Sequence, residues 1–435
     1  MTATTQEQAF DPAAPRHVPD PHALFHRMRE QAPFHRQVGP SSGRVFWYLT
    51  RYADVQRALH DPGVGRQLDR LPAELAGLHR RWDNDALAMV RRNVFNLDPP
   101  DHTRLRRLMA PGFGARPVAA LVRTVHRVVG ELVDAMAGMD AKGATATGAM
   151  NAMDAMNATN GMGASAAAGG EVDVVRALAL PLPILVVADL LGFPAEDRAL
   201  FRRWSDEMLA GRDGAETRRS GMKFVAHITE RIRERRSREG DDLLSHLLRA
   251  EDGGQITRLE LISSVFQLLF AGDETTVNLI GIGVLELLRH PEQLALLRAR
   301  PELIDSAVEE VLRYNGPVGH SRPLYAMTDV DFGGTVIARG DIIVPVLLAA
   351  NRDPAVFPRP DVFAIDRSPN RHLGFGHGIH FCLGAALARV QARAAIGTLV
   401  RRFPRMALAV DPGELEWTRE LFLRGVRRLP LRLHG

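Results

Sequence analysis

The feature that most constrains the fold is one long apolar stretch near the middle of the chain. It runs from Thr257 to His290, and Pro291 follows it directly. Thr257 and Glu260 have the T-x-x-E spacing of a capping box, which marks the first turn of a helix. A helix over this stretch would be about 50 Å long at about 1.5 Å per residue. Such a helix crosses a whole domain, so the rest of the chain must pack around it.

Helical patterns also dominate the sequence on both sides of this stretch. Helices are predicted shortly after residue 20, from Arg51 to Pro62, from Pro301 to Tyr314, and in the segment that follows Cys382. Short extended pieces with turn signals are predicted at 44–49, at 329–346 and near the C-terminus. Because no β-α-β repeat is visible, the sequence predicts a mainly α fold with small β-sheets (α+β).

The domain organisation predicted from the sequence is simple. Residues 1–20 are polar and Pro-rich, which is typical of a flexible lead-in, and residues 21–435 are predicted to form a single domain. Residues 138–170 are almost all Ala, Met, Gly, Asn and Thr, with no apolar period. This composition predicts a disordered insertion. A Met-rich metal or partner site is the alternative, but no fixed spacing supports it.

Composition narrows the possible partners. The chain has 55 Lys and Arg against 51 Asp and Glu, a net charge of +4, and its cations are almost all Arg. An Arg bias can indicate nucleic-acid binding, but the acids are interspersed and no aromatic–basic stripe is present, so we predict no nucleic-acid partner. Gln267, Asp273 and Glu274 interrupt the apolar stretch, and no signal peptide is recognisable at the N-terminus. We therefore expect a cytoplasmic protein with no membrane insertion.

The chemistry is concentrated around the single cysteine. Cys382 lies in the segment FGHGIHFCLG (375–384), with Gly376 and Gly378 before it and Gly384 after it. The glycines let the backbone approach a flat group and adopt unusual dihedral angles. The helix that follows would present unpaired N–H groups and a positive dipole end to the sulfur, which favours the thiolate. A thiolate of this kind suits the axial position of a haem iron. A small buried cysteine and a catalytic nucleophile are the alternatives.

This segment resembles the haem-binding loop of the cytochrome P-450 family, F-G-x-G-x-H-x-C-x-G. The resemblance covers the chain from about residue 20 onward, except 138–170. It implies the cytochrome P-450 fold, with haem b (iron protoporphyrin IX) lying between the long central helix and the helix that follows the cysteine loop. It makes Cys382 the axial ligand of the haem iron. Further cofactor-binding residues that it implies are Phe375, Gly376, His380, Gly384, His102, Arg106, Arg322, Ala271 and Gly272.

Three motifs elsewhere agree with this resemblance. The first is the run from Ala271 to Thr276, where small and polar residues interrupt the apolar helix. Its small residues would leave room for a flat cofactor and O2. The resemblance implies that Thr275 hydrogen-bonds the bound dioxygen and that Glu274 relays protons, with Glu where the family commonly has Asp. A helix kink or a surface patch is the alternative explanation.

The second motif is Glu310-x-x-Arg313. By itself it is weak, since a Glu and an Arg at this spacing usually form a surface ion pair. Together with Arg367 it resembles the buried Glu-Arg-Arg network that holds the haem loop in this family.

The third motif contains His102 and Arg106, which share a helix face. The resemblance assigns these two residues, with Arg322 and His380, to the haem propionates.

The resemblance implies a bacterial-type haem–thiolate monooxygenase that hydroxylates or epoxidises a hydrophobic small molecule of secondary metabolism. It would use O2 and electrons from a separate ferredoxin and ferredoxin reductase. A peroxide-driven peroxygenase, a desaturase and a non-enzymatic haem protein are the alternatives. Cations that could attract an acidic ferredoxin, or could simply be solvated, are Arg104, Arg107, Arg371 and Arg389.

The substrate pocket can be placed only by family position. That position suggests the segments 62–97 and 198–224, and the residues Gln267, Phe270, Val318, Leu421 and Phe422. Most of these residues are apolar, so we expect a hydrophobic substrate. Four arginines of the first segment could anchor a carboxylate, or could be solvated: Arg66, Arg70, Arg91 and Arg92.

Overall fold

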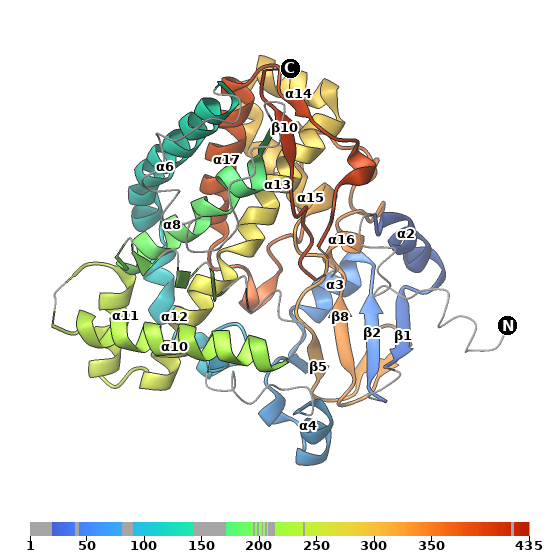
Figure 1. Cartoon of the computed structure of the whole chain (residues 1–435). Coiled ribbons are helices and arrows are strands. Elements are labelled where there is room, and N and C mark those ends of the chain that lie inside the picture. Colours follow the sequence, from blue (N-terminus) through green and yellow to red (C-terminus); the bar gives the residue numbers. More distant parts are fainter. Residues whose placement is uncertain are drawn as a thin grey trace. The chain divides into compact units, whose positions relative to one another are not determined.

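The computed structural model confirms a mainly helical chain with small β-sheets (Figure 1). It describes residues 20–434 except 40–42, 81–89, 142–170, 195, 198–199, 202, 205–206, 208–213, 238–239 and 419–421. The chain forms two compact units, and the following paragraphs describe each by itself. The first comprises Met1–Asp83, Arg289–Ala385 and Glu416–Arg427, and the second comprises Asn84–Leu288, Ala386–Leu415 and Arg428–Gly435. The single-domain organisation of residues 21–435 stays a prediction.

The first unit is built on a five-stranded sheet with the order β1-β2-β8-β5-β3. Its central strands β2 and β8 run parallel, while the other neighbours are antiparallel. The strands are β1 (Phe34–Val38), β2 (Val45–Leu49), β3 (Val64–Gly65), β5 (Leu324–Ala326) and β8 (Ile342–Pro345), with a separate pair β6 (Val330–Asp331) and β7 (Val336–Ile337). The helices are α2 (His22–Gln31), α3 (Tyr52–Ala58), α4 (Ala73–Arg80), α14 (Pro291–Ala299), α15 (Ile304–Asn315) and α16 (Leu347–Ala350).

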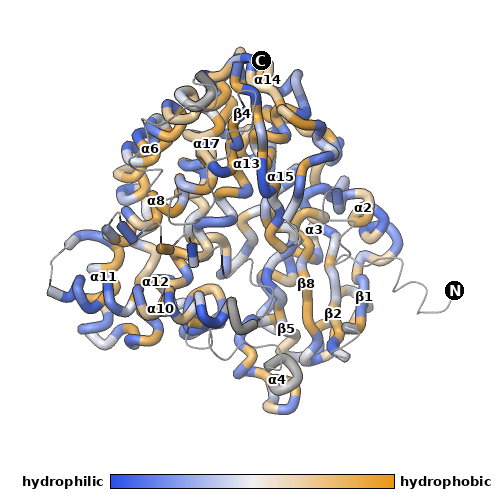
Figure 2. Tube along the Cα trace, in the orientation of Figure 1, coloured by the Kyte–Doolittle hydropathy of each residue, from blue (hydrophilic) through white to orange (hydrophobic). Residues whose placement is uncertain are grey.

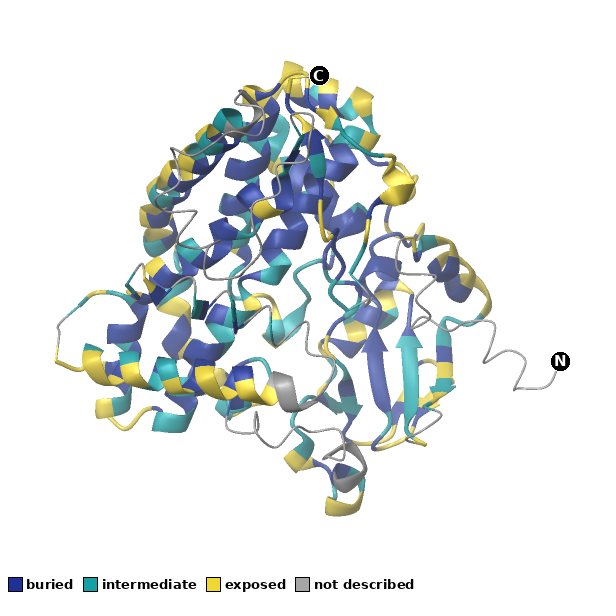
Figure 3. Cartoon of the chain, viewed as in Figure 1, coloured by how far each residue is buried: buried dark blue, intermediate teal, exposed yellow. Residues whose placement is uncertain are grey.

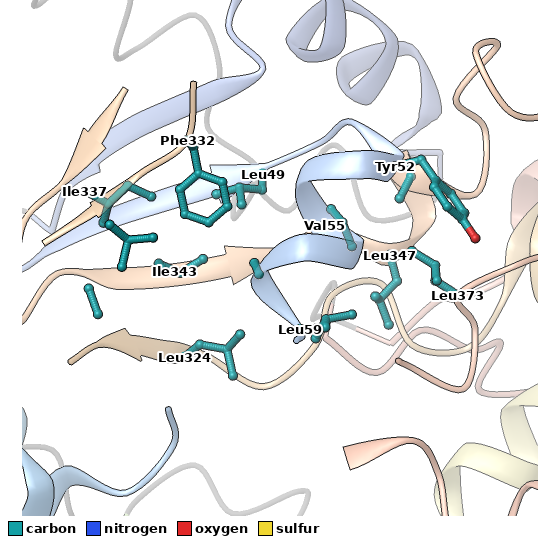
Figure 4. Packing of buried hydrophobic residues seen from close by; sticks show 14 of the residues in the cluster. Leu49, Tyr52, Val55, Leu59, Leu324, Phe332, Ile337, Ile343, Leu347 and Leu373 are labelled. Carbon is teal, nitrogen blue, oxygen red and sulfur yellow. The ribbon is translucent and has the colours of Figure 1, made fainter. Parts of the chain in front are cut away.

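The hydrophobic core of this unit includes a residue that precedes the cysteine loop. Helix α3 follows β2 and buries Val55 and Leu59 with Leu324 and Ile343 of the sheet (Figure 4). Leu373, two residues before Phe375, belongs to the same buried cluster and is only 2% exposed. Burial of a leucine contributes about 1.5–3 kcal/mol. The sheet core therefore fixes the chain just before the cysteine loop begins.

The first residue of α2 gives the fold a predictable pH dependence. Loss of water around the His22 ring, and the charges of Arg352 and Arg424, lower its pKa well below 6.5. The unfolded chain takes up a proton at His22 near pH 6.5, so the folded state is the poorer proton acceptor. The free energy of unfolding should therefore fall as the pH drops below 6.5, by about 1.4 kcal/mol per pH unit, until the folded-state pKa is reached.

Denaturant unfolding between about pH 7 and pH 5 measures this slope. The variant His22→Gln should reduce this slope by the contribution of one proton, about 1.4 kcal/mol per pH unit. His26→Gln, an exposed position on the same helix, is the matched control and should leave it unchanged. Equal acid slopes in wild type and His22→Gln would contradict the assignment.

The second unit is mainly helical, with one small sheet of order β4-β10-β9. Its helices are α5 (Asp101–Met109), α6 (Ala115–Ala141), α8 (Pro181–Leu191), α10 (Gly214–Arg235), α11 (Leu243–Asp252), α12 (Arg258–Ala271), α13 (Glu274–Arg289) and α17 (Ala385–Arg402). Its strands are β4 (Glu171–Asp173), β9 (Ala407–Leu408) and β10 (Pro430–Arg432). Hydropathy separates α8, which is strongly apolar and buried, from the hydrophilic α10 (Figure 2). This contrast makes α8 an interior helix.

The long apolar stretch is two helices rather than the one predicted. Its start is as expected, because Thr257 and Glu260 form both hydrogen bonds of a capping box. The helix breaks after Ala271. The Thr276 N–H then donates to the Asp273 carbonyl, a bond between residues three apart at the start of α13. The single-helix prediction was therefore wrong at Gly272 and Asp273. The break coincides with the small and polar residues that interrupt the apolar run, and such residues are common at helix kinks.

Two expectations about chain segments have mixed outcomes. The helix α6 continues to Ala141, so residues 138–141 are helical, and the rest of the predicted insertion, 142–170, lies outside the described residues, as do residues 1–19 of the lead-in. Within the described part, Arg258–Arg289 is the one stretch long and apolar enough to cross a membrane. However, 67% of its most apolar window is buried inside the protein, as in a core helix.

Candidate active site

The cysteine loop forms a tight turn at the start of α17. The Cys382 backbone N–H donates to the Phe375 carbonyl at 2.9 Å, and the Gly376 N–H donates to the Leu373 carbonyl at 2.8 Å. A 3-10 turn over Gly378–His380 closes the loop between these bonds. Cys382 itself is exposed, and α17 begins three residues later. The backbone thus holds the only thiol of the chain in the open, at the N-terminal end of a helix.

Glycine is required inside this loop. Gly376 and Gly378 have φ angles of +75° and +70°, a conformation that side chains strongly disfavour. A Cβ atom at Gly378 would also lie 2.6 Å from the Leu59 carbonyl oxygen at the end of α3. Two large apolar residues beside the thiol, Ile379 and Phe381, are exposed. The loop therefore presents an apolar surface around Cys382 that a flat apolar group can cover.

Glu310, Arg313 and Arg367 form the buried network that the sequence predicts. The Arg313 guanidinium donates to both Glu310 oxygens at 2.8 Å, and Arg367 Nε donates to the same carboxylate at 3.1 and 3.2 Å. The Glu310 and Arg313 side chains have no solvent exposure. Burial lowers the pKa of Arg313, but Glu310 opposes the shift. The surface ion-pair alternative is thereby excluded for this E-x-x-R motif.

A buried asparagine, which sequence reasoning missed, connects this network to the cysteine loop. Arg313 donates to the backbone carbonyl of Asn351 at 3.1 Å. The Asn351 side chain in turn accepts the backbone N–H of Leu373 at 2.7 Å. Leu373 then accepts the Gly376 N–H, which begins the loop. Asn351 follows α16 without any recognisable motif, so only the three-dimensional structure could reveal this connection.

In the second unit, the helix break forms a small notch around Ala271. The Thr275 hydroxyl donates to the Ala271 carbonyl at 3.0 Å, so the side chain replaces the missing helical bond. Ala271 is exposed although Leu269 and Asp273 on either side of it are buried. A Cβ atom at Gly272 would lie 3.1 Å from both the Leu268 carbonyl oxygen and a Val187 methyl carbon. A side chain at Gly272 would therefore fit tightly against these two neighbours.

Two acids precede Thr275, and they differ in position. Glu274 is half-buried and is the first residue of α13. Asp273 is only 2% exposed, and its carbonyl accepts the N–H groups of Thr276 and Val277. Asp273 thus begins the helix through its backbone, and Glu274 is the more accessible acid beside the threonine.

The helix α5 carries the predicted propionate contacts of the second unit. His102 is 2% exposed, Arg106 is half-buried, and they are one turn apart. The corresponding residues of the first unit, Arg322 and His380, are exposed and half-buried, respectively. Each of the four side chains carries a hydrogen-bond donor or a positive charge that can pair with a carboxylate.

An ion-pair network on α5 removes two other candidates. Arg104 binds the buried Glu260 at 2.6 Å and Asp101 at 3.0 Å, and Arg92 lies 3.4 Å from Asp101. Burial alone raises the pKa of Glu260, but hydrogen bonds from Arg104 and Thr257 outweigh it and lower the pKa overall. Arg104 is therefore a structural ion-pair partner rather than a free docking cation. Arg92 is engaged in the same way, and Arg66, Arg70 and Arg91 also interact within the chain.

The predicted substrate residues lie in both units. Phe270 stacks on Phe266 at 5.9 Å with nearly parallel rings, and Gln267 lies one turn before Ala271 on α12. In the first unit, Val318 forms a β-bridge with Leu423, the residue after Phe422. Leu421 lies outside the described residues.

His320 is a further candidate that sequence reasoning missed. Its Nδ1–H donates to the Ser321 carbonyl at 2.7 Å, and its ring lies 5.3 Å from the Phe422 ring. Burial lowers the pKa of His320, so the ring is neutral near neutral pH. No sequence motif surrounds this histidine. It leaves Nε2 as an acceptor close to Phe422, a position where it could meet a polar group of a substrate.

These residues fit a haem–thiolate group. The chain supplies an exposed thiol on a loop with glycines at positive φ, and a helix break where Gly272 lies close to Val187. It also supplies a buried ion-pair network that is connected to the loop through Asn351 and Leu373. Among the described residues, no cluster of three or more His, Cys, Asp or Glu side chains could hold a free metal ion. An exposed thiol on a loop of fixed backbone suits a haem group, whose iron a thiolate can ligate.

Comparisons with known proteins point the same way. A family model described as cytochrome P-450 matches residues 75–300 and 294–413. The monooxygenase PikC of Streptomyces venezuelae, described as a cytochrome P-450, is 40% identical over 415 residues, which cover 95% of this chain and 91% of PikC.

Solved structures extend the likeness to the fold. The cytochrome P-450 PksS of the bacillaene polyketide synthase of Bacillus subtilis 168 is similar with a TM-score of 0.84 and 34% identity, covering 98% of this chain and all of PksS. The cytochrome P-450 enzyme BioI, solved with hexadec-9Z-enoic acid ligated to an acyl carrier protein, has a TM-score of 0.81 and 31% identity, covering 96% of this chain and 99% of BioI.

Proposed function

Because the chain belongs to the cytochrome P-450 family, we propose that it hydroxylates or epoxidises a hydrophobic organic molecule with one atom of O2. As a member of this family it is an oxidoreductase of the monooxygenase type. The observation that carries the proposal is the placement of Cys382, whose thiol is exposed at the start of α17 on a loop that Gly376 and Gly378 alone permit. Haem b, when bound through this thiolate, supplies the iron that activates dioxygen.

The residues that we propose to hold the haem are those that match the motifs of the cytochrome P-450 family. Phe375, Gly376 and Gly384 would shape the loop around the thiolate. His102, Arg106, Arg322 and His380 would bind the two propionates, because a buried carboxylate needs cationic or donor partners. The role of Glu310, Arg313 and Arg367 is to keep the loop in place through Asn351 and Leu373.

Proton delivery is the task that we assign to Thr275 and Glu274. The Thr275 hydroxyl now donates to the Ala271 carbonyl, and it can instead donate toward the notch, where O2 would lie. Glu274, half-buried at the start of α13, is placed to replace that proton from solvent. This acid–alcohol pair favours the O2-dependent monooxygenase over a peroxide-driven peroxygenase, which needs no proton relay.

Replacing Thr275 by alanine should uncouple the reaction. Reducing equivalents should still be consumed, but product per electron pair should fall by about tenfold or more, with peroxide appearing instead. Thr275→Ser keeps the hydroxyl and should restore most of the coupling. Comparing reductant consumption, peroxide and product in the three proteins tests the role, and ¹⁸O2 should label the product. Unchanged coupling in Thr275→Ala would contradict the role of Thr275. Product formed from added peroxide without reductant would favour the peroxygenase, and an unlabelled, dehydrogenated product would favour the desaturase.

The electron donors that we propose are a separate ferredoxin and its reductase. Arg107 and Arg371 support this, because both are exposed and neither forms an ion pair among the described residues. Positive charge at exposed positions would attract an acidic ferredoxin. We further propose a cytoplasmic location.

The substrate that we propose is a largely apolar product of secondary metabolism. Phe270, Gln267, Val318 and Phe422 would contact it. Because the relative PksS belongs to a polyketide synthase and BioI was solved with a carrier-bound acid, we include acyl or polyketide chains that are attached to a carrier protein. Three exposed cations on α10, Arg218, Arg219 and Lys223, favour the carrier-bound form of the substrate.

A further inference from the structure

The helix α10 has two faces of opposite character. Phe224, Val225 and Ile228 are buried, while Met222, Lys223 and Ala226 are exposed, and Figure 3 shows buried and exposed residues alternating along this helix. The exposed residues of its N-terminal half repeat at i, i+1, i+4 and i+5 and therefore share one face. We define the α10 face by these residues: Arg218, Arg219, Met222 and Lys223.

The cations on this helix fall into two groups. In the C-terminal half they bind carboxylates, since Arg231 binds Asp197 at 2.7 Å and Arg233 binds Glu230 at 2.5 Å. Arg235 and the following Arg236 also bind acids. In contrast, the three cations of the α10 face form no ion pair or side-chain hydrogen bond within the described part of the chain. Intramolecular pairing thus explains one end of the basic run and leaves the other end available.

We propose that the α10 face docks an acidic carrier protein that delivers the substrate as a tethered acyl chain. The inference rests on the proposed monooxygenase function. Three cations on one face, without an ion pair among the described residues, complement an acidic partner and accelerate encounter with it. Met222, 56% exposed, adds an apolar centre, and Met and Arg are enriched at protein interfaces. The face therefore has both the charge and the apolar contact that a protein partner needs.

The position of this face suits delivery to the notch on α12. On its buried side, α10 contacts α12 through Phe224 and Phe266, whose rings are 5.2 Å apart. Phe266 stacks on Phe270, the residue before Ala271. Packed helices have axes about 8–10 Å apart. A carrier on the outer face of α10 would thus be about one helix away from the helix that carries Ala271 and Thr275, within reach of a flexible prosthetic arm.

Charge reversal tests this proposal. The variant Arg218→Glu/Arg219→Glu/Lys223→Glu changes only exposed side chains. The matched control is Arg298→Glu, at an exposed cation on α14 that forms no ion pair with any residue the structure describes. Binding of a purified acyl carrier protein loaded with palmitic acid is measured for each haem-loaded protein at low and high salt. The triple variant should bind it about tenfold more weakly or worse at low salt, and Arg298→Glu should bind it as wild type does.

Controls separate the possible failures. Free palmitate, followed by the spin-state change of the haem, should bind all three proteins alike. Equal carrier affinity in wild type and the triple variant, or no carrier binding by wild type, would overturn the proposal. Wild-type binding to anionic lipid vesicles but not to the carrier would identify the face as a membrane contact and would overturn it too. Failure of the monooxygenase proposal would appear separately, as loss of product from a free substrate in wild type.

Discussion

The variant Cys382→Ser should lose the red-shifted Soret band of the reduced, carbon-monoxide-bound protein and all monooxygenase turnover. The wild-type band depends on a thiolate opposite the carbon monoxide, and a serine hydroxyl is far less readily ionised and donates much less electron density to iron. The structure strengthens the expectation, because Cys382 is the only cysteine in the chain and no other thiol can take its place. The loop should survive, since its bond from residue 382 to the Phe375 carbonyl uses the backbone N–H.

The matched control is a neighbour on the same loop. Ile379→Ala removes an exposed apolar side chain but no ligand, and we expect it to keep the red-shifted band. Both variants should show wild-type helicity by circular dichroism, which separates loss of the ligand from loss of the fold. A red-shifted band in Cys382→Ser, or its absence in haem-loaded wild type, would contradict the axial role of this thiolate.

The local features of the fold could be predicted because each depends on residues that are close in sequence. The capping box of Thr257 and Glu260 is an example, since both partners lie within one helical turn. The break at Gly272 was visible as a run of small and polar residues. However, the sequence could not decide between a continuous helix and two helices, because a threonine hydroxyl can bond the carbonyl four residues earlier in either arrangement.

Long-range pairings were out of reach for a different reason. Nothing in the sequence around Arg104 indicates that its guanidinium binds Glu260, 156 residues later. The same holds for the parallel pairing of Phe46 with Ile342, which sets the centre of the sheet. Such contacts depend on the packing of the whole core. The sequence between the two partners does not indicate that they will pair.

The candidate site follows the same division. The cysteine loop and the Glu310 network were predictable from motifs that resemble a known family. Asn351 and His320 were not, because a single asparagine or histidine in a loop has many structural explanations. Their roles depend on partners that only folding brings close: Leu373 for Asn351, and Phe422 for His320. A family motif thus identifies the reacting group, while the residues that hold or surround it need the structure.

The variant Glu310→Gln should cost about 3–5 kcal/mol of folding free energy, which is typical when a buried ion pair loses one partner. Glu310 accepts hydrogen bonds from Arg313, Arg367, Asn370 and the Ala364 N–H. A glutamine can accept these bonds at only one atom, and its NH2 group would face other donors. It would also leave two buried guanidinium groups without a carboxylate.

The matched control for this variant is its neighbour on α15. Glu309 binds His372 at 3.0 Å and is about one quarter exposed, so Glu309→Gln should cost well under 1–2 kcal/mol. Denaturant unfolding of both variants measures the difference. Because the network reaches Leu373 and the cysteine loop, Glu310→Gln should also shift carbon-monoxide-bound protein toward the short-wavelength band, whereas Glu309→Gln should not. Similar unfolding midpoints for the two variants would show that the Glu310 network does not anchor this part of the fold, and that the loop is held instead by the apolar cluster around Leu373.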